Sequence, residues 1–450
     1  MRVLAVLITV FTIASSLAGA TEAPPEERID HVVVIVLQDA TFDHMFGTYP
    51  GVNGIEPRRH WMRGPRGRRH APVALTPADL GRRGSFPLRP GEEALSNGAA
   101  AARAAFNGGR MDGFLAAQRE RDKHAALALR HYDRSTMPAI WALADEYVLF
   151  DRFFSATLGE SLPNSLSLCA SAHHGFRRGT RATLGELWRS DFPTIFDRAD
   201  AAGISWRYYV GNFDSFNEAP TVKRGSLTAG SRTTLLYRAP VLSLRRFWEP
   251  AMRENLGSQT DFFEDAARGD VASISYILPS PNTNWPTNPL QSQARLLSII
   301  NALQKSPVWE RTAAFVVWDD WGGFYDHVLP PRPRRTQLGF RVPALLISPL
   351  AKRGYVSSLR YDHTSIPAFI AKTFGMEPLR EGRSPGSFAE VWAAEPRPEG
   401  RIFTIGKPSE YVAKGRQHGQ NVLRLYLVGL GWTLLALALL RILAGRQARR

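Results

Sequence analysis

The chain is nearly free of cysteine, and its acidic residues are outnumbered by basic ones. Cys169 is the single cysteine among 450 residues, so no disulfide can form within the chain and packing must hold the fold. Lysine and arginine number 56 against 41 aspartates and glutamates, which gives a formal net charge of +15. A basic surface can attract nucleic acid, but no recognisable nucleic-acid-binding motif accompanies it, and we expect no such partner.

Charge is also nearly absent from the first 20 positions. The segment MRVLAVLITVFTIASSLAGA has one early arginine, an apolar centre, and small residues at Ala18 and Ala20. This pattern is typical of a secretory signal peptide removed after about residue 20. An uncleaved membrane anchor is the alternative. We therefore expect an exported protein whose body lies on the periplasmic or extracellular side of the cell membrane.

A second run without charge precedes Arg441 near the other end. It is short for a hydrocarbon core of about 30 Å, but snorkelling of Arg441 would extend the span. We predict a single-pass transmembrane helix at 421–444, reached through a linker at 396–420 and followed by a short basic cytoplasmic tail at 445–450. An interfacial or core helix is the alternative. Residues 21–395 would then form one domain tethered to the membrane.

Apolar runs that could form strands alternate with amphipathic helical patterns along the chain. We predict strands at 31–37, 204–210, 271–278, 312–318 and 342–347. We predict helices at 138–147, 194–202, 259–268, 292–303 and 364–374. This alternation predicts an α/β sandwich, with a mainly parallel central sheet and helices on both faces.

One stretch departs from the alternation. Residues 58–110 are rich in glycine, arginine, alanine and proline, and we expect an irregular insertion there. Its most basic part, RRHWMRGPRGRRH at 58–70, is expected to be a solvated loop, with a contact to lipid headgroups as the alternative.

Polar side chains follow two of the predicted strands directly. Gln38 and Asp39 end the first apolar run, and Asp319 and Asp320 end the run at 312–318. Parallel sheets bind ligands at the carboxyl ends of their strands, and adjacent buried carboxylates repel each other unless a cation neutralises them. The three acids, helped by the amide, are therefore candidate ligands of one divalent metal ion. Ordinary turn and capping roles are the alternative.

A serine lies at the entry of a predicted helix between these two strands. Gly159 and Pro163 bracket Ser161, and the helical run extends from about residue 164 to 172. A hydroxyl at a helix N-terminus faces a site that attracts phosphate, and beside a divalent cation it can be ionised and attack phosphorus. The alternative is an ordinary N-cap.

Seven ordered motifs between about Asp30 and Met376 carry a resemblance to a known family. They are IDHVVVIVLQDATFDHMFG, NGGRMDGF, YDRSTMPAIWALADEYVLFDRFFS, GESLPNS, AGISWRYY, WDDWGGFYDHV and RVPALLISPLAKRGYVSSLRYDHTS. With these the chain resembles the bacterial phosphoesterase family of phospholipases C and related acid phosphatases, within the alkaline-phosphatase-like superfamily. The resemblance implies a metal-dependent phosphoester hydrolase that passes through a covalent phospho-enzyme.

The resemblance also implies roles for the residues at the strand ends. The family ends its first strand with Glu-Asn, both metal ligands, whereas this chain has Gln38-Asp39, with carboxylate and amide in reversed order. The paired acids of the family fall on Asp319 and Asp320 without change. Its nucleophile falls on Ser161, within a pattern of glycine, proline and asparagine.

Further positions match the family motifs. Asn164 would donate a hydrogen bond to a phosphoryl oxygen. His327 in FYDHV and His363 in YDHTS are candidate catalytic residues, or structural ones that hold loops. His173 and His174 could replace a lost general acid, with a helix-end pair that takes no part in catalysis as the alternative.

Besides Gln38, three positions depart from the family pattern. Ser165 stands in place of an arginine, Asn97 in place of a histidine, and Trp285 in place of the histidine that precedes a proline. Loss of a general acid typically slows a reaction ~10²–10⁴-fold. The alternative function is therefore an impaired family member that binds a phosphorylated ligand or a metal without efficient turnover.

Together these expectations predict that the chain is a membrane-tethered phosphoester hydrolase with one divalent ion. The choice between Mg, Ca, Mn, Fe and Zn stays open. The substrate could be a phospholipid, since the tail would hold the domain near a bilayer, or a soluble phosphomonoester. The oligomeric state stays open.

Overall fold

A computed structural model describes most of the chain between residues 25 and 404. The described ranges are 25–64, 69–76, 95–118, 125–176, 181–213, 219–223, 226–228, 233–279, 289–333, 336–379, 387–397 and 399–404. Within them, no helix has both the length and the apolar character needed to cross a membrane. The predicted signal peptide, the predicted helix at 421–444 and Trp285 lie outside the described residues, and what we expect of them stays a prediction.

The centre of the molecule is an eight-stranded sheet, ordered β11-β8-β12-β1-β13-β14-β6-β15. Its strands are β1 (His31–Leu37), β6 (Val148–Phe150), β8 (Trp206–Val210), β11 (Leu256–Ser258), β12 (Ile274–Leu278), β13 (Thr312–Trp318), β14 (Ala344–Ile347) and β15 (Tyr355–Ser357). Strand β14 runs antiparallel to both of its neighbours, and the other neighbouring pairs are parallel. The prediction of a mainly parallel sheet is confirmed.

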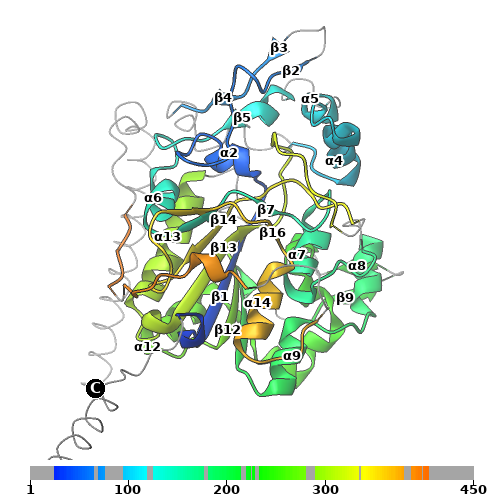
Figure 1. The fold of residues 1–450 in the computed structure, drawn as a ribbon. Coiled ribbons are helices and arrows are strands. Elements are labelled where there is room, and N and C mark those ends of the chain that lie inside the picture. The colour runs from blue at the N-terminus through cyan, green and yellow to red at the C-terminus, as the bar shows by residue number, and fades with distance from the viewer. Residues whose placement is uncertain are drawn as a thin grey trace, which may run out of the picture.

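Helices cover both faces of this sheet (Figure 1). One layer contains α6 (Pro138–Glu146), α12 (Gln259–Arg268) and α13 (Pro289–Lys305). The other contains α7 (Ser161–Ala170), α9 (Ile195–Ala202) and α14 (Ser365–Thr373). Helix α12 shows why the local sequence folds this way. Ser258 and Asp261 form a capping box at its start, and Gly269, with φ of 79°, ends it.

The inner strands are apolar because the helices bury both of their faces. Every residue of β13 is buried, and so are all residues of β1 after His31. Continuous apolar runs of this kind are typical of parallel strands that are covered on both sides. The two strands pair in register from His31 opposite Thr312 to Leu37 opposite Trp318, so they end together at the same edge of the sheet.

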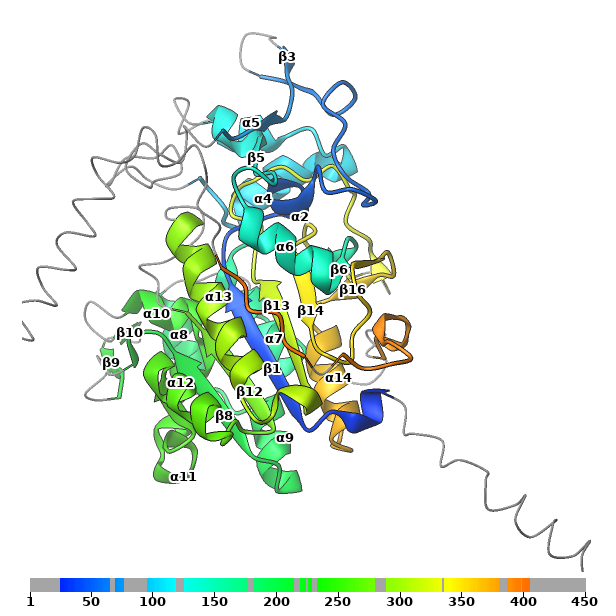
Figure 2. The same cartoon turned by 90° about the vertical axis from the view of Figure 1, so that its left-hand side faces the viewer.

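A smaller layer lies beyond the carboxyl end of β1 (Figures 1 and 2). It includes α2 (Phe42–Phe46), α4 (Ala99–Phe106), α5 (Phe114–Ala117) and the short strands β2 (Met62–Arg63), β3 (Arg69–His70), β4 (Val73–Ala74) and β5 (Arg130–His131). Its own apolar core packs Phe114 and Met62 against Trp321, which follows β13. The prediction of an irregular insertion at 58–110 is wrong for α4, whose alanine-rich sequence favours a helix.

The predicted elements agree closely with the observed ones. The strands at 31–37 and 312–318 and the helix at 259–268 have the predicted bounds. The helix that contains Ser161 begins about three residues earlier than predicted, so the serine is its first residue and Glu160 is the N-cap. The start of the predicted linker is docked, because Phe403 exchanges two backbone hydrogen bonds with the Asn301 amide, at 2.7 and 2.9 Å.

Candidate active site

The ends of β1 and β13 bring the predicted acids to one edge of the sheet. The Asp319 backbone N–H donates to the carbonyl oxygen of Leu37 at 2.9 Å, and the Ala40 N–H donates to the carbonyl oxygen of Asp320 at 3.0 Å. Asp39 lies between these bonds in a left-handed conformation, with φ of 60°, which a non-glycine residue seldom adopts. Gln38 is 6% exposed and lies beside it. The chain is thus held in place where the two strands stop.

Gly322 makes the close approach of the two strand ends possible. Its φ is 59°, and a Cβ atom built on it would lie 2.4 Å from the carbonyl oxygen of Asp39. No side chain fits at that distance, so glycine is required there for steric as well as conformational reasons. Its N–H donates to Asp320 Oδ1 at 2.8 Å, which fixes the orientation of that carboxylate.

The first turn of α7 presents hydroxyl groups to the acid pair. Ser161 Oγ donates to Asp320 Oδ2 at 2.9 Å. One turn further along the helix, Ser165 Oγ donates to Asp319 Oδ2 at 3.3 Å. The other oxygen of that carboxylate, Asp319 Oδ1, is buried and has no hydrogen-bond partner among the described residues. A buried carboxylate oxygen without a partner is costly, so the site has a place for a cation or a proton.

Burial raises the pKa values of all three acids, and repulsion by neighbouring carboxylates adds to the increase for Asp319 and Asp320. Burial raises the pKa of Asp319 to about 7, with a further increase from the charge of Asp39 and a decrease from Arg238. Burial, followed by the charges of the other two acids, raises the pKa of Asp320 well above its ordinary value. Burial also raises the pKa of Asp39. A divalent ion would reverse these shifts, because its charge favours the ionised carboxylates.

Asn97, from the smaller layer, completes this group. Its Nδ2 donates to Asp39 Oδ1 at 3.0 Å and lies 3.5 Å from Asp320 Oδ2. The Trp321 indole donates to the Asn97 carbonyl oxygen at 2.7 Å, so the segment after β13 holds the asparagine in place. The position at which the family resemblance implies a histidine therefore does lie at the acids, but it carries an amide.

The other predicted site residues contact the protein itself. The Asn164 side chain accepts from the Thr157 N–H at 3.0 Å and donates to Glu160 O at 3.2 Å, so it holds the loop before Ser161. The buried His363 accepts from the Ala156 N–H at 3.3 Å through Nδ1. Its Nε2 donates to Trp318 O at 3.0 Å. Burial lowers the pKa of His363 to about 4, so the ring is neutral at pH 7.

His327 belongs to a second cluster, with Asp43 and Asp326. Among the described residues, these are the only three His, Cys, Asp or Glu side chains whose ligand atoms all lie within 4.8 Å of one another, and Asp39, Asp319 and Asp320 do not meet that spacing. A buried arginine, however, already neutralises the cluster. Arg341 Nη2 donates to Asp43 at 2.8 Å, and its Nε donates to Asp326 at 2.9 Å.

A metal ion in this second cluster would have to displace a guanidinium that is 0% exposed. Among the described residues, the acids at the strand ends form no such ion pair, and Asp319 Oδ1 has no hydrogen-bond partner. Three carboxylates and an amide form an oxygen-rich donor set that suits a hard divalent ion. The strand ends therefore fit a divalent cation better than the Asp43–Asp326–His327 cluster does.

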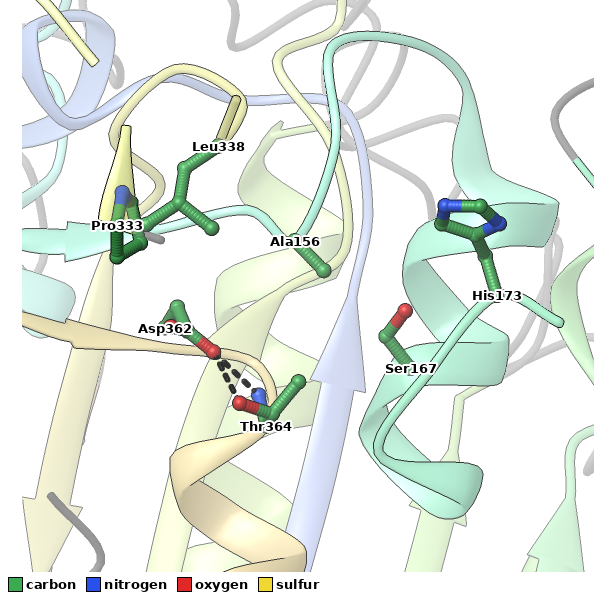
Figure 3. Close-up of a pocket in the computed structure, with 7 residues that line it drawn as sticks. All are labelled: Ala156, Ser167, His173, Pro333, Leu338, Asp362 and Thr364. Carbon is green, nitrogen blue, oxygen red and sulfur yellow. Dashed lines mark hydrogen bonds between the residues drawn. The ribbon is translucent and has the colours of Figure 1, made fainter. Parts of the chain in front are cut away.

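The two adjacent histidines after α7 differ in their surroundings. His174 stacks on Phe192, with ring centroids 3.9 Å apart. His173 Nδ1 accepts from the Gly175 N–H at 3.1 Å, and the ring lines two pockets. Figure 3 shows the smaller one, between α7 and the start of α14, where Asp362 accepts hydrogen bonds from Thr364.

The larger pocket borders the loop that leads to Ser161. Besides His173 it is lined by Thr157 and Leu158 from that loop and by Arg103 and Phe106 from α4. A pocket with one arginine, bordered by the loop that precedes a candidate nucleophile, has the charge and position to admit an anionic ester.

Arg238 is the site residue that the sequence did not reveal. Burial lowers the pKa of Arg238 to about 10. The negative charges of Asp319 and then Asp39 act in the opposite direction and raise it. The one available signal is an arginine within the apolar segment TTLLYRAPVL, which indicates a buried cation but not its partner.

The comparison with known proteins agrees with the predicted family. The Phosphoesterase family profile matches residues 29–377, and the chain belongs to this family. Membership indicates an enzyme that hydrolyses phosphoric esters. Similar proteins include a non-hemolytic phospholipase C of Pseudomonas aeruginosa, 27% identical over 81% of this chain and 57% of that protein. Another is phospholipase C B of Mycobacterium tuberculosis, 25% identical over 77% of this chain and 74% of that protein.

A further relative, a non-hemolytic phospholipase C of Burkholderia pseudomallei, is 25% identical over 77% of this chain and 55% of its own length. The chain thus spans little more than half of two of these relatives. Among solved structures, a phosphonate monoester hydrolase from Silicibacter pomeroyi matches with a TM-score of 0.33 and 12% identity, over 56% of this chain and 71% of that one. A protein in the alkaline phosphatase superfamily from Vibrio parahaemolyticus matches with a TM-score of 0.31 and 15% identity, over 54% and 62%.

Proposed function

We propose that this chain is a metal-dependent phosphoester hydrolase of the phospholipase C or acid phosphatase type, with Ser161 as its nucleophile. The observation that carries the proposal is the hydrogen bond of 2.9 Å from Ser161 Oγ to Asp320, at the joint end of β1 and β13. A serine that begins a helix and donates to a buried carboxylate has both a proton acceptor and an anion-attracting helix end.

In this proposal Asp39, Asp319 and Asp320, with help from Gln38, hold one divalent cation. When bound, the cation would supply positive charge that lowers the pKa of the attacking hydroxyl and offsets the charge on the phosphoryl group. Asp320 accepts the proton from Ser161, the Oγ–P bond forms, and the bond from phosphorus to the ester oxygen breaks. The departing alkoxide takes up the proton that Asp320 accepted and leaves as the alcohol, and water then hydrolyses the phosphoserine to free Ser161 and phosphate.

The remaining predicted residues support the site in this proposal. Asn164 holds the loop before Ser161, and His363 ties that region to the end of β13 through Trp318. His327 belongs with the Arg341 cluster beneath α2. We place all three in the proposal as positioning residues, since each one contacts the protein through the atoms that would otherwise reach a substrate.

The substrate class in this proposal is a phosphoester, either a phospholipid or a soluble phosphomonoester. The names of the relatives favour a phospholipase C activity. Export through residues 1–20 and anchoring through 421–444 belong to the same proposal, because a tethered domain would meet phospholipids at the bilayer surface.

A second candidate function is binding without turnover. The observation that favours it is the position of Asn97. Its Nδ2 lies 3.0 Å from Asp39 Oδ1 and 3.5 Å from Asp320 Oδ2, at a position where the family resemblance implies a histidine. An amide cannot donate a proton to a leaving group at neutral pH, so a protein of this kind could hold a phosphorylated ligand and hydrolyse it slowly.

The experiment compares the full-length protein with its Ser161→Ala variant. Both are assayed on p-nitrophenyl phosphate and p-nitrophenyl phosphorylcholine, with EDTA and then with each of Mg²⁺, Ca²⁺, Mn²⁺, Fe²⁺ and Zn²⁺. We expect metal-dependent release that falls by about 10³-fold or more in the variant. The preferred ester separates a phosphatase from a phospholipase C.

Ser167→Ala is the matched control. This serine lies on the same helix, but its hydroxyl donates to the carbonyl oxygen of Pro163 at 2.8 Å, away from the acids. It should retain the wild-type rate. Equal rates for the wild type and Ser161→Ala with every metal would refute the serine mechanism, and absence of turnover with retained phosphate binding would favour the binding function.

A further inference from the structure

Arg238, a partly buried residue, carries a guanidinium with unused hydrogen-bonding capacity. It is the last residue of α10 (Thr233–Arg238). Its Nε and Nη1 atoms are buried and have no hydrogen-bond partner among the described residues. Leaving such donors unsatisfied is costly, and the cost is greater for a charged group. A ligand that accepts these hydrogen bonds would therefore bind there favourably.

The guanidinium lies within electrostatic range of the proposed site. Helix α10 packs against α7, the helix that begins with Ser161. The charges of Asp319 and Asp39 act on Arg238, in that order of strength. Neither acid accepts a hydrogen bond from its Nε or Nη1. The guanidinium is thus close enough to the acids to feel their field, while its buried nitrogens stay available.

Arg341 shows how this protein treats a buried arginine whose role is structural. Its nitrogens donate to Asp43, to Asp326 and to the carbonyl oxygens of Asn53 and Asp151, at 2.8 to 2.9 Å. A guanidinium saturated in this way has no capacity left for a ligand. Arg238 is equally charged but unsaturated at two nitrogens, and the missing acceptors are on no residue that the structure describes.

The chemistry of the surroundings defines the missing acceptor. An anion with oxygen atoms would suit Arg238, because the planar guanidinium fork matches the geometry of phosphate and carboxylate. The proposed function brings such a group, a phosphoryl, onto Ser161, the first residue of the helix against which α10 packs. At position 165, where the family resemblance implies an arginine, this chain has a serine, and its hydroxyl donates to Asp319 at 3.3 Å.

We propose that Arg238 binds the non-bridging oxygens of the phosphoryl group at Ser161, and so supplies from α10 the cationic phosphate contact that α7 lacks. This inference rests on the proposed function for the place of the phosphoryl group. It goes beyond it by naming the residue that recognises the anion. A guanidinium there stabilises the phosphate in the substrate and in the phosphoserine alike, so its loss should weaken phosphate binding as well as turnover.

The test measures phosphate binding independently of turnover. Titration calorimetry with inorganic phosphate, and inhibition by orthovanadate, are applied to the full-length protein in Mn²⁺, to Arg238→Gln and to Arg238→Lys. We expect the dissociation constant for phosphate to rise about 10–100-fold in the glutamine variant, and less in the lysine variant, which keeps the charge but loses the fork. Arg245→Gln, at an arginine whose side chain is 69% exposed, is the control and should bind as the wild type does.

The outcomes separate this inference from the proposed function. An active wild type with unchanged phosphate affinity in Arg238→Gln overturns the inference and leaves the serine mechanism standing. A wild type without turnover whose phosphate binding depends on Arg238 supports the inference and overturns the hydrolase. A wild type that binds no phosphate with any metal overturns the inference. If Arg238→Gln fails to fold, Arg238→Lys decides: wild-type phosphate affinity in a folded lysine variant shows that the fork makes no contact, whereas weakened affinity supports the inference.

Discussion

Replacing Arg341 by methionine tests whether the buried cluster beneath α2 is structural. The guanidinium is 0% exposed and forms ion pairs with Asp43 at 2.8 Å and Asp326 at 2.9 Å. It also donates to the carbonyl oxygens of Asn53 and Asp151, which belong to separate parts of the chain. Methionine has a similar length but can satisfy none of these acceptors, so Arg341→Met leaves two buried carboxylates without their cation.

The expected loss of stability follows from that geometry. Removing one partner of a buried ion pair typically costs about 3–5 kcal/mol. Protonation limits the cost, because burial already raises the pKa of Asp326 to about 6 with Arg341 in place, and removal of the positive charge raises it further. Each unit of difference between the pKa of Asp326 in the variant and in the wild type is worth about 1.4 kcal/mol. At pH 7.5, folding of the variant requires Asp326 to take up a proton, whereas folding of the wild type does not. The destabilisation should therefore be about 2 kcal/mol smaller at pH 5.5 than at pH 7.5.

The assay is urea unfolding of the purified protein at the two pH values, followed by tryptophan fluorescence. Arg311→Met is the control, since Arg311 pairs with Asp30 at the surface, where the two side chains are 55% and 49% exposed, and it should cost less than about 1 kcal/mol. A loss below about 1 kcal/mol for Arg341→Met, or one that does not change with pH, would refute the structural reading of the cluster.

Three further predictions concern the site and its supports. Asp319→Asn should abolish the rise in melting temperature that Mn²⁺ causes, whereas His327→Asn should keep it, and the opposite result would move the metal to the second cluster. His363 has a folded pKa of about 4, below its unfolded value of about 6.5, so its contribution is complete above pH 6.5 and is lost as pH falls. His363→Asn should therefore remove about 3 kcal/mol of acid sensitivity between pH 6.5 and 4, measured as urea midpoints. Gly322→Ala should lower activity at least tenfold. Gly375→Ala is the control, because Gly375 has a similar φ of 61° but no atom within 4 Å of an added Cβ, and it should keep the wild-type activity. Equal effects of the two substitutions would show that the close approach of Gly322 to Asp39 is unimportant.

Much of the fold could be predicted because its inner strands have a clear signal in the sequence. The runs at 31–37 and 312–318 are long, apolar and bounded by polar residues, and the structure gives both strands these bounds. Strands β6, β11 and β15 were missed, because three residues are too few to establish an alternating pattern. The direction of β14 could not be read either, since direction depends on the path of the preceding loop and leaves no periodic signal.

The residues of the site likewise fall into those that the sequence pattern predicts and those that it does not. The acids after β1 and β13 follow from the rule that parallel sheets bind ligands at the carboxyl ends of their strands. Asn97 and Arg238 obey no such rule. One lies in a segment without regular structure and the other at the end of a six-residue helix, and only the tertiary path brings them to the acids. The residue pattern identifies what a strand end presents, and the family resemblance singles out Asn97, but no feature of the sequence indicates that Arg238 acts on the acids.

The charge balance at the strand ends links the metal, Arg238 and the substrate. Three ionised acids there amount to −3, and burial makes that state unfavourable, as the raised pKa of Asp319, about 7, indicates. Arg238 and a divalent ion together supply +3 and bring the site close to neutrality before any ligand arrives. A phosphate diester then adds a single negative charge, whereas a monoester dianion adds two. Because excess negative charge is costly in a buried site, the proposed metal site and Arg238 contact predict a preference for diesters such as phospholipids, and the ratio of the two p-nitrophenyl rates tests that prediction.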